Sequence, residues 1–486
     1  MIDSTAGDAA AATGTQAPPA RPRPARRSPA ALPFTFADAA LAEAIATERG
    51  EPDWLRVDRL AGAAAIDALP TEGNQLYTPY IDLRAAKLEG ARPYLRTASA
   101  AATTASAGTG LPEDAAGVIE IVEDGVGTVA LTPDAVAAGV TLETFGAAFE
   151  RDPDGLRADL EGGRSLPSND RLAALARGFW SQGVRLVVPA GVRLDRPIVI
   201  RWRSSRPERA LIGRSVIRLG DGARASVVEE IEPSGPPIAC AAGEEVPQGL
   251  FAGTAELTLG RDAHLAFASI QDLRTSQVAF AHRHASIGEG ATLHWALAQL
   301  GSKLVRSRVD NRLEGDRSSV EQVEIVFGGE DQLFDLTSYT RHIGRDTTGN
   351  LLSKGALLDR ARSYMKGLIT IEKSAVGTDS FLGEFGMNLS RAARAVAIPS
   401  LEIDQPDCRR AAHSSSVGPI DEGQRFYLET RGIPPDEARK FIVLGFLEPV
   451  VARMPLEGAR ERLRSLLEEK WAASGGMAAA SGASAA

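Results

Sequence analysis

The chain has 486 residues, 44% of them hydrophobic, and a formal net charge of −9. That length suits one large body with appended pieces, while the mild acidity and the lack of a Lys/Arg run in the body disfavour nucleic acid or a membrane surface as the partner. The sequence contains no stretch of about 18 apolar residues, so no transmembrane helix is expected. The two cysteines, Cys240 and Cys408, favour a reducing, cytoplasmic compartment over a disulfide framework.

Residues 1–33 are predicted to form a disordered tail. They are rich in Ala, Pro and Thr and contain no signal-peptide h-region. A transit peptide is the alternative interpretation of the four arginines between positions 21 and 27, but Asp3 and Asp8 favour the tail.

Residues 34–182 are assigned to an N-terminal helical or mixed domain. Apolar residues at helical spacing predict a helix over 36–49 that Gly50 stops, and Pro52 opens a second one. The low-complexity stretch 97–109 is interpreted as a linker.

The rest of this domain is predicted to mix strands and helices. Strands are expected at 118–122 and 128–131, with Gly125 and Gly127 in the turn, and helices near 134–150 and 170–181.

Residues 183–430 are predicted to form a solenoid of stacked β-coils. The basis is an internal repeat of an apolar residue, a Gly-containing turn, a small residue and an alternating strand. Its copies are LGDGARASVVEE (219–230), LGRDAHLAFASIQD (259–272), IGEGATLHWALAQL (287–300) and, more loosely, LEGDRSSVEQVEIV (313–326). A solenoid pairs its internal strand edges but leaves two ends, which the flanking helical pieces could cover.

The strand pattern breaks at Arg431-Gly432, so residues 431–472 are predicted to be a helical pair, followed by a disordered tail over 473–486. Both helices carry apolar residues at three-to-four spacing, which a partner or the solenoid end could bury. The residues in question are Ala438, Phe441, Ile442, Phe446, Leu463 and Leu467. We expect a chain ending at Arg431 to stay folded.

The sequence contains no phosphate-binding Walker A motif and no H-E-x-x-H motif, so no ATP hydrolysis is expected of the chain itself. His282 and His284 alternate on one predicted strand, where they could ligate a metal or simply face solvent. His264 and His294 each stand alone in a repeat strand and are interpreted as satisfied polar residues.

Cys408 and His413 lie five residues apart near the predicted end of the solenoid. Both are potential ligands of a soft metal. The alternative is a small buried thiol and an unrelated histidine.

The same region resembles a known family. PSLEI (399–403), His413 with its small neighbours, and FYLETRGIPPDEARKFIVLGF (426–446) resemble the C-terminal signature of the SufB/SufD proteins of SUF iron–sulfur cluster assembly. Further upstream, 51–70 resembles the SufD helical N-terminus, and 179–200 and 353–370 resemble coils of the family's β-helix, so the resemblance covers roughly 36–471.

The resemblance implies a mainly β protein, a right-handed parallel β-helix flanked by an N-terminal helical domain and a C-terminal helical pair. It implies a non-catalytic scaffold subunit that pairs with a SufB-type subunit, binds a SufC-type ATPase through the C-terminal helices, and contributes to iron supply and nascent cluster formation. Two cysteines cannot supply the four thiolates that usually hold a cluster, so no cofactor is expected to be stably bound by this chain alone. Iron or a nascent cluster would be shared with SufB.

Within the family the residues resemble the SufD branch. The stretch 381–399 contains no cysteine, whereas SufB carries a functional one in that coil. His413 takes the position of the SufD interface histidine, and Ala411 stands where many SufD proteins have Cys. Cys408 lies five residues before His413 and has the opposite strand parity, which would point it to the other face, so the resemblance does not carry the cysteine role over to it.

Two alternatives remain at the level of the sequence. One is a SufB-like homodimeric scaffold, which the missing cysteine weakens. The other is a β-helix polysaccharide lyase or hydrolase, which would require clustered carboxylates on one face and usually secretion.

Overall fold

A computed structural model describes residues 35–95, 111–161, 166–237 and 246–473. The predicted tail 1–33, the predicted linker 97–109, residues 474–486 of the second predicted tail, and Cys240 lie outside the described residues.

The N-terminal part mixes helices and strands, and its helices are shorter than predicted while its two predicted strands are longer. The elements are α1 (Ala39–Arg49), α2 (Asp53–Ala68), the 3₁₀ turn η1 (Thr78–Tyr80), β1 (Arg92–Pro93), β2 (Gly117–Val122), β3 (Gly125–Leu131), α3 (Pro133–Ala137), β4 (Thr141–Thr144), α4 (Phe145–Arg151), α5 (Pro153–Leu160) and α6 (Arg171–Phe179). Asp38 caps α1 by accepting a hydrogen bond from the Leu41 amide, and Gly50 ends it at φ 62°.

Two local predictions for this part are wrong. The turn between β2 and β3 lies at 123–124, with Glu123 at φ 54°, so Gly125 and Gly127 belong to the strand. The helix predicted near 134–150 is interrupted because Gly139, at φ 78°, follows α3, and the chain then forms β4, which pairs antiparallel with β5 (Gln182–Val188).

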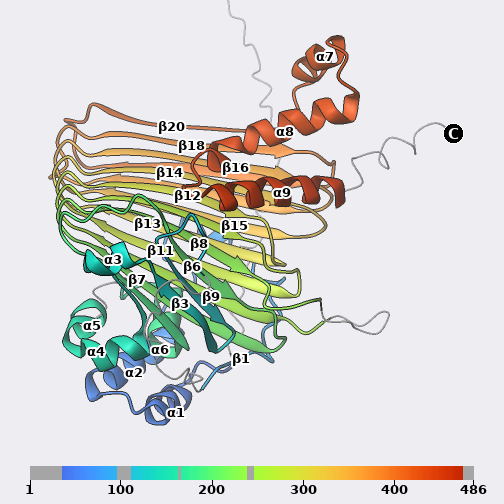
Figure 1. Cartoon of the computed structure of the whole chain (residues 1–486). Coiled ribbons are helices and arrows are strands. Elements are labelled where there is room, and N and C mark those ends of the chain that lie inside the picture. Colours follow the sequence, from blue (N-terminus) through green and yellow to red (C-terminus); the bar gives the residue numbers. More distant parts are fainter. Residues whose placement is uncertain (1–34, 96–110, 162–165, 238–245, 474–486) are drawn as a thin grey trace, which may run out of the picture.

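The body of the protein is a parallel β-solenoid, which confirms the predicted fold class (Figure 1). Sheet A contains β5 (Gln182–Val188), β7 (Arg209–Leu219), β9 (Gly249–Leu259), β11 (Gln277–Ile287), β13 (Leu304–Leu313), β15 (Leu333–His342), β17 (Arg362–Ile371) and β19 (Arg394–Ile403). Sheet B contains β6 (Ile198–Arg203), β8 (Arg224–Glu232), β10 (His264–Gln271), β12 (Thr292–Gln299), β14 (Ser319–Gly328), β16 (Thr348–Leu357), β18 (Asp379–Asn388) and β20 (Arg410–Gly418). Each coil therefore adds one strand to each sheet.

The repeated turn explains why the sequence pattern predicts this fold. Each copy places one residue in the left-handed backbone conformation. In the first, second and third copies this residue is Gly222, Asp262 and Gly290, respectively. The glycine two positions earlier is needed for stacking, since a Cβ on Gly220 would come within 2.5 Å of the Ala190 amide nitrogen of the neighbouring coil. The left-handed position tolerates Asp, so only the stacking position keeps its glycine in all three.

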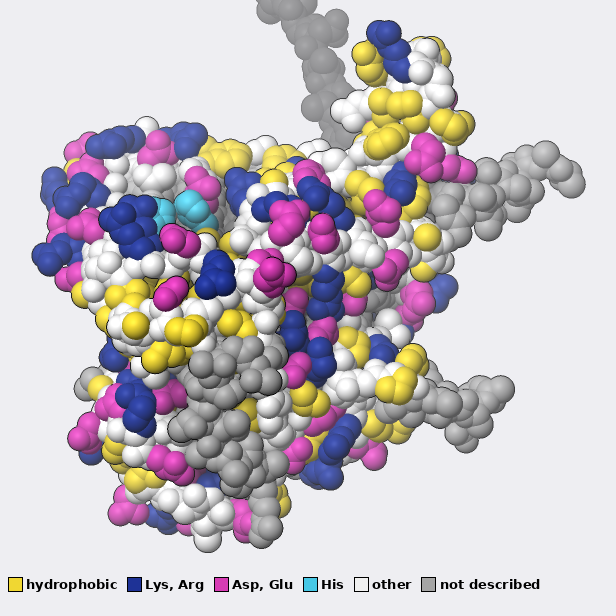
Figure 2. Space-filling view, in the orientation of Figure 1, with side chains coloured by type: hydrophobic (Ala, Val, Ile, Leu, Met, Phe, Trp, Pro, Cys, Tyr) yellow, Lys and Arg dark blue, Asp and Glu magenta, His cyan; other side chains and the backbone are white. Residues whose placement is uncertain are grey.

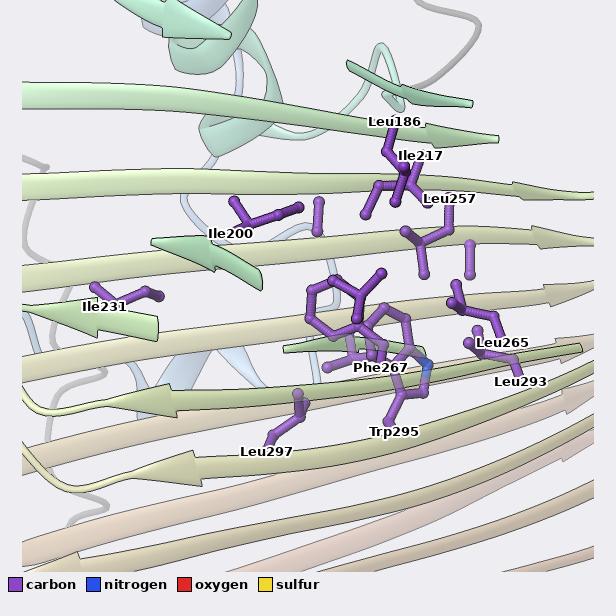
Figure 3. Close-up of a cluster of buried hydrophobic side chains, with 14 of the residues drawn as sticks. Leu186, Ile200, Ile217, Ile231, Leu257, Leu265, Phe267, Leu293, Trp295 and Leu297 are labelled. Carbon is purple, nitrogen blue, oxygen red and sulfur yellow. The ribbon is translucent and has the colours of Figure 1, made fainter. Parts of the chain in front are cut away.

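The space between the two sheets is filled by a continuous hydrophobic core. Trp202, Trp295 and Phe267 are among its largest side chains, each no more than 1% exposed, and Figure 3 shows Phe267 and Trp295 packed among leucines and isoleucines of both sheets. Burial of a large apolar side chain contributes about 1.5–3 kcal/mol, so stability accumulates along the whole axis.

The two ends of the solenoid differ. At the N-terminal end, β3 and β4 continue the two sheets as antiparallel strands. At the C-terminal end, β19 and β20 each pair with one described strand only. The C-terminal helices are α7 (Glu422–Thr430), α8 (Pro435–Val451) and α9 (Glu457–Ala473).

The predicted position of the C-terminal helices needs a correction. The strands end at Gly418 and α7 follows, so the range 183–430 predicted for the solenoid includes one helix. α8 and α9 lie across the outer face of sheet B instead of over the solenoid end, and α7 projects away from the body (Figure 1). None of the helices within the described ranges combines the length and apolar character needed to span a bilayer.

Candidate functional site at the open end of the solenoid

The C-terminal end of the solenoid presents two strand edges. β19 and β20 are less buried than the strands before them, and Ile403 and Val417 are 45% and 40% exposed. An unpaired edge offers backbone N–H and C=O groups to another strand. This end therefore has the chemistry of a protein interface.

His413 lies on β20 and is exposed. Its register partner is Leu382 of β18, which belongs to a buried cluster with Leu351 of sheet B and Ile369 of sheet A. Paired residues of parallel strands point to the same face, so His413 is on the face that looks into the solenoid, one layer beyond its last filled layer.

Cys408 is a free thiol of intermediate exposure, and the expectation that it points away from His413 is wrong. It lies in the turn before β20, where strand parity does not apply. Together with Ala411 it packs against the same cluster that contains Leu382. Cys408 therefore contacts the interior of the last coils.

The sequence analysis missed Glu384, a buried carboxyl in the layer below His413. It lies on β18 two residues after Leu382, is 1% exposed, and accepts a hydrogen bond from the Ile398 amide at 2.7 Å. Burial raises the pKa of Glu384 to about 7, although the Ile398 amide and Lys366 act against the rise. Three apolar residues of this strand, Phe381, Phe385 and Met387, have the parity opposite to Glu384, so sequence alternation would have placed the carboxyl outside the solenoid.

The described residues contain no group of three or more His, Cys, Asp and Glu side chains placed to hold a metal ion. Neither His413 nor Cys408 therefore belongs to such a group.

The residues predicted to bind the ATPase separate into two groups. Ala438, Leu463 and Leu467 are at most 2% exposed, while Ile442 and Phe446 are partly buried against the same sheet B cluster. Phe441 is 57% exposed.

Two further aromatic residues that were not predicted lie near Phe441 in sequence, on the projecting helix α7. Phe426 is 67% exposed and Tyr427 is 58% exposed. Figure 2 shows hydrophobic side chains gathered on this projection. Exposed large apolar groups of this kind mark interaction surfaces.

The histidines on β11 do not face solvent. His282 is 1% exposed and lies between Asp310, with Nε2 at 2.5 Å from Oδ2, and Asp170, with Nδ1 at 3.3 Å from Oδ1. His284 is 9% exposed. His264 and His294 are not isolated either, because their rings meet edge to face at 5.8 Å.

Comparison with known proteins adds independent information. Residues 202–446 match the sequence model of the family described as "SUF system FeS cluster assembly, SufBD core domain". The chain is 28% identical over 301 residues to the iron–sulfur cluster assembly protein SufD of Bacillus subtilis, which covers 62% of this chain and 67% of the relative.

Other relatives carry the family name without the SufD designation. A SufBD family protein of Mycobacterium tuberculosis is 28% identical over 321 residues, covering 65% of this chain and 77% of the relative. One of Staphylococcus epidermidis is 27% identical over 329 residues, covering 66% and 69%.

Proposed function

Because this chain belongs to the SufBD family of iron–sulfur cluster assembly proteins, we propose that it is the SufD-type subunit of a SUF scaffold. In this proposal it acts without catalysing a reaction itself, pairs with a SufB-type subunit in the cytoplasm, and binds a SufC-type ATPase. Iron or a nascent cluster is the cargo of the complex and is shared between the two scaffold subunits.

The observation that carries the proposal is the open end, where His413 faces inward one layer beyond Leu382, and Glu384 lies buried in the layer below. A neutral imidazole is a ligand for iron at cellular pH. Because the described residues offer no complete ligand set, the partner subunit would supply the remaining ligands, thiolate among them. The exposed edges of β19 and β20 would bring the two chains together at that point.

The SufB-like homodimer remains a second candidate, because the same edges could pair with another copy of this chain. The family membership gives the polysaccharide-active alternative no support. The lack of cysteine between positions 381 and 399 favours the SufD assignment over the SufB one.

The test is a substitution of His413 by Ala in the complex co-expressed with SufB-type and SufC-type partners. The exposed side chain contributes little to the core, so the complex should assemble normally. The iron and sulfide content of the complex should fall by about tenfold, because loss of a side chain that supports a metal site typically lowers metal affinity by that factor or more. His264→Ala is the matched control, since His264 lies on the outer face of the solenoid. If the His413→Ala complex carries as much iron and sulfide as the wild type, His413 has only a structural role.

A further inference from the structure

A cleft of about 270 Å³ lies on the outer face of sheet A, between the segment 167–169 and the later coils. Its lining includes His284, Arg308, Arg312, Tyr339, Arg341 and Thr370. The volume is just below the roughly 300–1,000 Å³ of drug-sized ligand pockets, which suits a molecule the size of a small metabolite. The iron–sulfur proposal makes no use of it.

His284 is the least satisfied polar group of this cleft. It is 9% exposed, and its Nδ1 is buried without a hydrogen-bond partner among the described residues. Buried polar atoms are nearly always hydrogen-bonded, and an exception calls for water or a ligand. Burial lowers the pKa of His284, so the ring is neutral and can either donate or accept a hydrogen bond.

Arg312 and Arg341 lie side by side on neighbouring coils. They are direct register partners of β13 and β15, and like charges placed directly opposite destabilise a sheet. Each pairs with an acid: Arg312 Nε lies 2.8 Å from Glu314, and Arg341 Nε lies 3.2 Å from Glu372. Their Nη groups make no hydrogen bond to any protein atom that the structure describes.

The other charged groups of the cleft are already satisfied. Arg308 pairs with Asp310 at 2.9 Å and with Asp170 at 2.5 Å, and its guanidinium stacks on the Tyr339 ring at 4.8 Å. The Tyr339 hydroxyl donates to Glu72 at 2.6 Å. These residues form a fixed wall. The hydrogen-bonding groups left for a ligand are the buried Nδ1 of His284 and the Nη groups of Arg312 and Arg341, whose side chains are 38% and 50% exposed to solvent.

We propose that this cleft binds a small organic anion, with a carboxylate or phosphate held by Arg312 and Arg341 and a second polar group hydrogen-bonded to His284. Paired guanidiniums match the planar oxygens of either group. Coil and residue spacing in a parallel sheet place the His284 and Arg312 backbones about 8 Å apart on the diagonal, which sets the separation of the two groups. Glu402 is also part of the lining, next to Thr370, so the anionic group is expected at the arginine end of the cleft.

The test measures binding of citrate, glycerol 3-phosphate and inorganic phosphate to the full chain by isothermal titration calorimetry in chloride buffer. We expect citrate or glycerol 3-phosphate to bind with a Kd below about 10 mM. The Arg312→Gln/Arg341→Gln double variant should weaken that binding by about tenfold or more, and His284→Phe should weaken it independently. Preference for citrate identifies a carboxylate ligand, and preference for glycerol 3-phosphate identifies a phosphate ester.

Arg261→Gln is the matched control, because Arg261 is exposed on the same solenoid and pairs with Asp221 at 3.1 Å. It should bind the probes as the wild type does. Thermal unfolding of each variant checks that the fold is kept. If the Arg312→Gln/Arg341→Gln double variant is destabilised, the single Arg341→Gln variant is used in its place. The proposal is overturned if neither organic probe binds, if inorganic phosphate binds better than both, or if the arginine variants bind like Arg261→Gln.

Discussion

At the scale of single residues, His282 shows how the solenoid and the N-terminal part are joined. Asp170 caps α6 by accepting from the Ala173 amide, and the same carboxylate contacts His282 and Arg308 of the solenoid. Burial alone would lower the pKa of His282, but Asp170 and Asp310 outweigh it and raise the pKa to about 9. The imidazole is therefore positively charged in the folded protein at neutral pH, and it cannot act as a metal ligand in that form.

Replacing His282 by Gln should lower the free energy of unfolding, because it leaves two buried carboxylates with fewer partners. The folded pKa of about 9 lies above the unfolded value of 6.5, so the stabilising contribution is complete below pH 6.5 and disappears as the pH rises through 9. That difference corresponds to about 3 kcal/mol at pH 6. Urea denaturation of wild type and variant from about pH 6 to 10 measures it.

His342→Gln is the control for this titration. Burial lowers the pKa of His342 to about 4, so the folded ring stays neutral over that range. The effect of this substitution should be constant above about pH 7. A His282→Gln effect that is equally constant would contradict the charged state assigned to His282.

At the scale of secondary-structure elements, α8 and α9 show what an apolar stripe can and cannot predict. Helical spacing identified both helices, but it does not say which surface buries the stripe. Here it is the protein's own sheet B: Leu463 and Leu467 pack in one cluster with Ala296 and Val323. A chain ending at Arg431 would expose that face, so the expectation that it stays folded is not supported by this packing.

The glycine turns of the repeat predicted the solenoid because part of their backbone requirement is local: Gly222 and Gly290 adopt the left-handed conformation within the turn itself. The candidate site depends on tertiary register, which is not local. Cys408 could be placed only once the start of β20 was known, and Glu384 only once both sheets were paired. His413 was identified by family resemblance, since one histidine in one strand carries no positional information.

Docking of the SufC-type ATPase is expected on the exposed side of α7 and α8. Substituting Phe426, Tyr427 and Phe441 together by Ala should reduce ATPase retention in a pull-down, because each buried aromatic contributes about 1.5–3 kcal/mol at an interface. Stability should hardly change, since all three side chains are more than half exposed. Val57→Ala on α2, at 61% exposure, is the matched control. Retention equal to that of the control would exclude this surface.

At the scale of the whole molecule, the asymmetry of the two ends gives the solenoid a direction. β3 and β4 extend the sheets at the N-terminal end, whereas β19 and β20 stop with apolar side chains exposed. Proteins usually protect such edges with charge or cover them. An edge that is neither charged along its length nor covered by a described element suits pairing with another chain.

We expect the Ile403→Lys/Val417→Lys double variant to lose the SufB-type partner while keeping its own fold. Both residues are at least 40% exposed, so lysine can be solvated in the free chain, but pairing would bury its charge. Losing about 1–2 kcal/mol at each position weakens the complex by roughly 30- to 1,000-fold, which size-exclusion chromatography of the co-expressed subunits detects. Val136→Lys on α3, at 53% exposure, should leave the complex intact.

If the chain without SufB is a dimer that the double variant converts to a monomer, the same edge also pairs two copies, as the homodimeric alternative requires. A double variant that keeps its partner would place the interface elsewhere and leave His413 facing solvent.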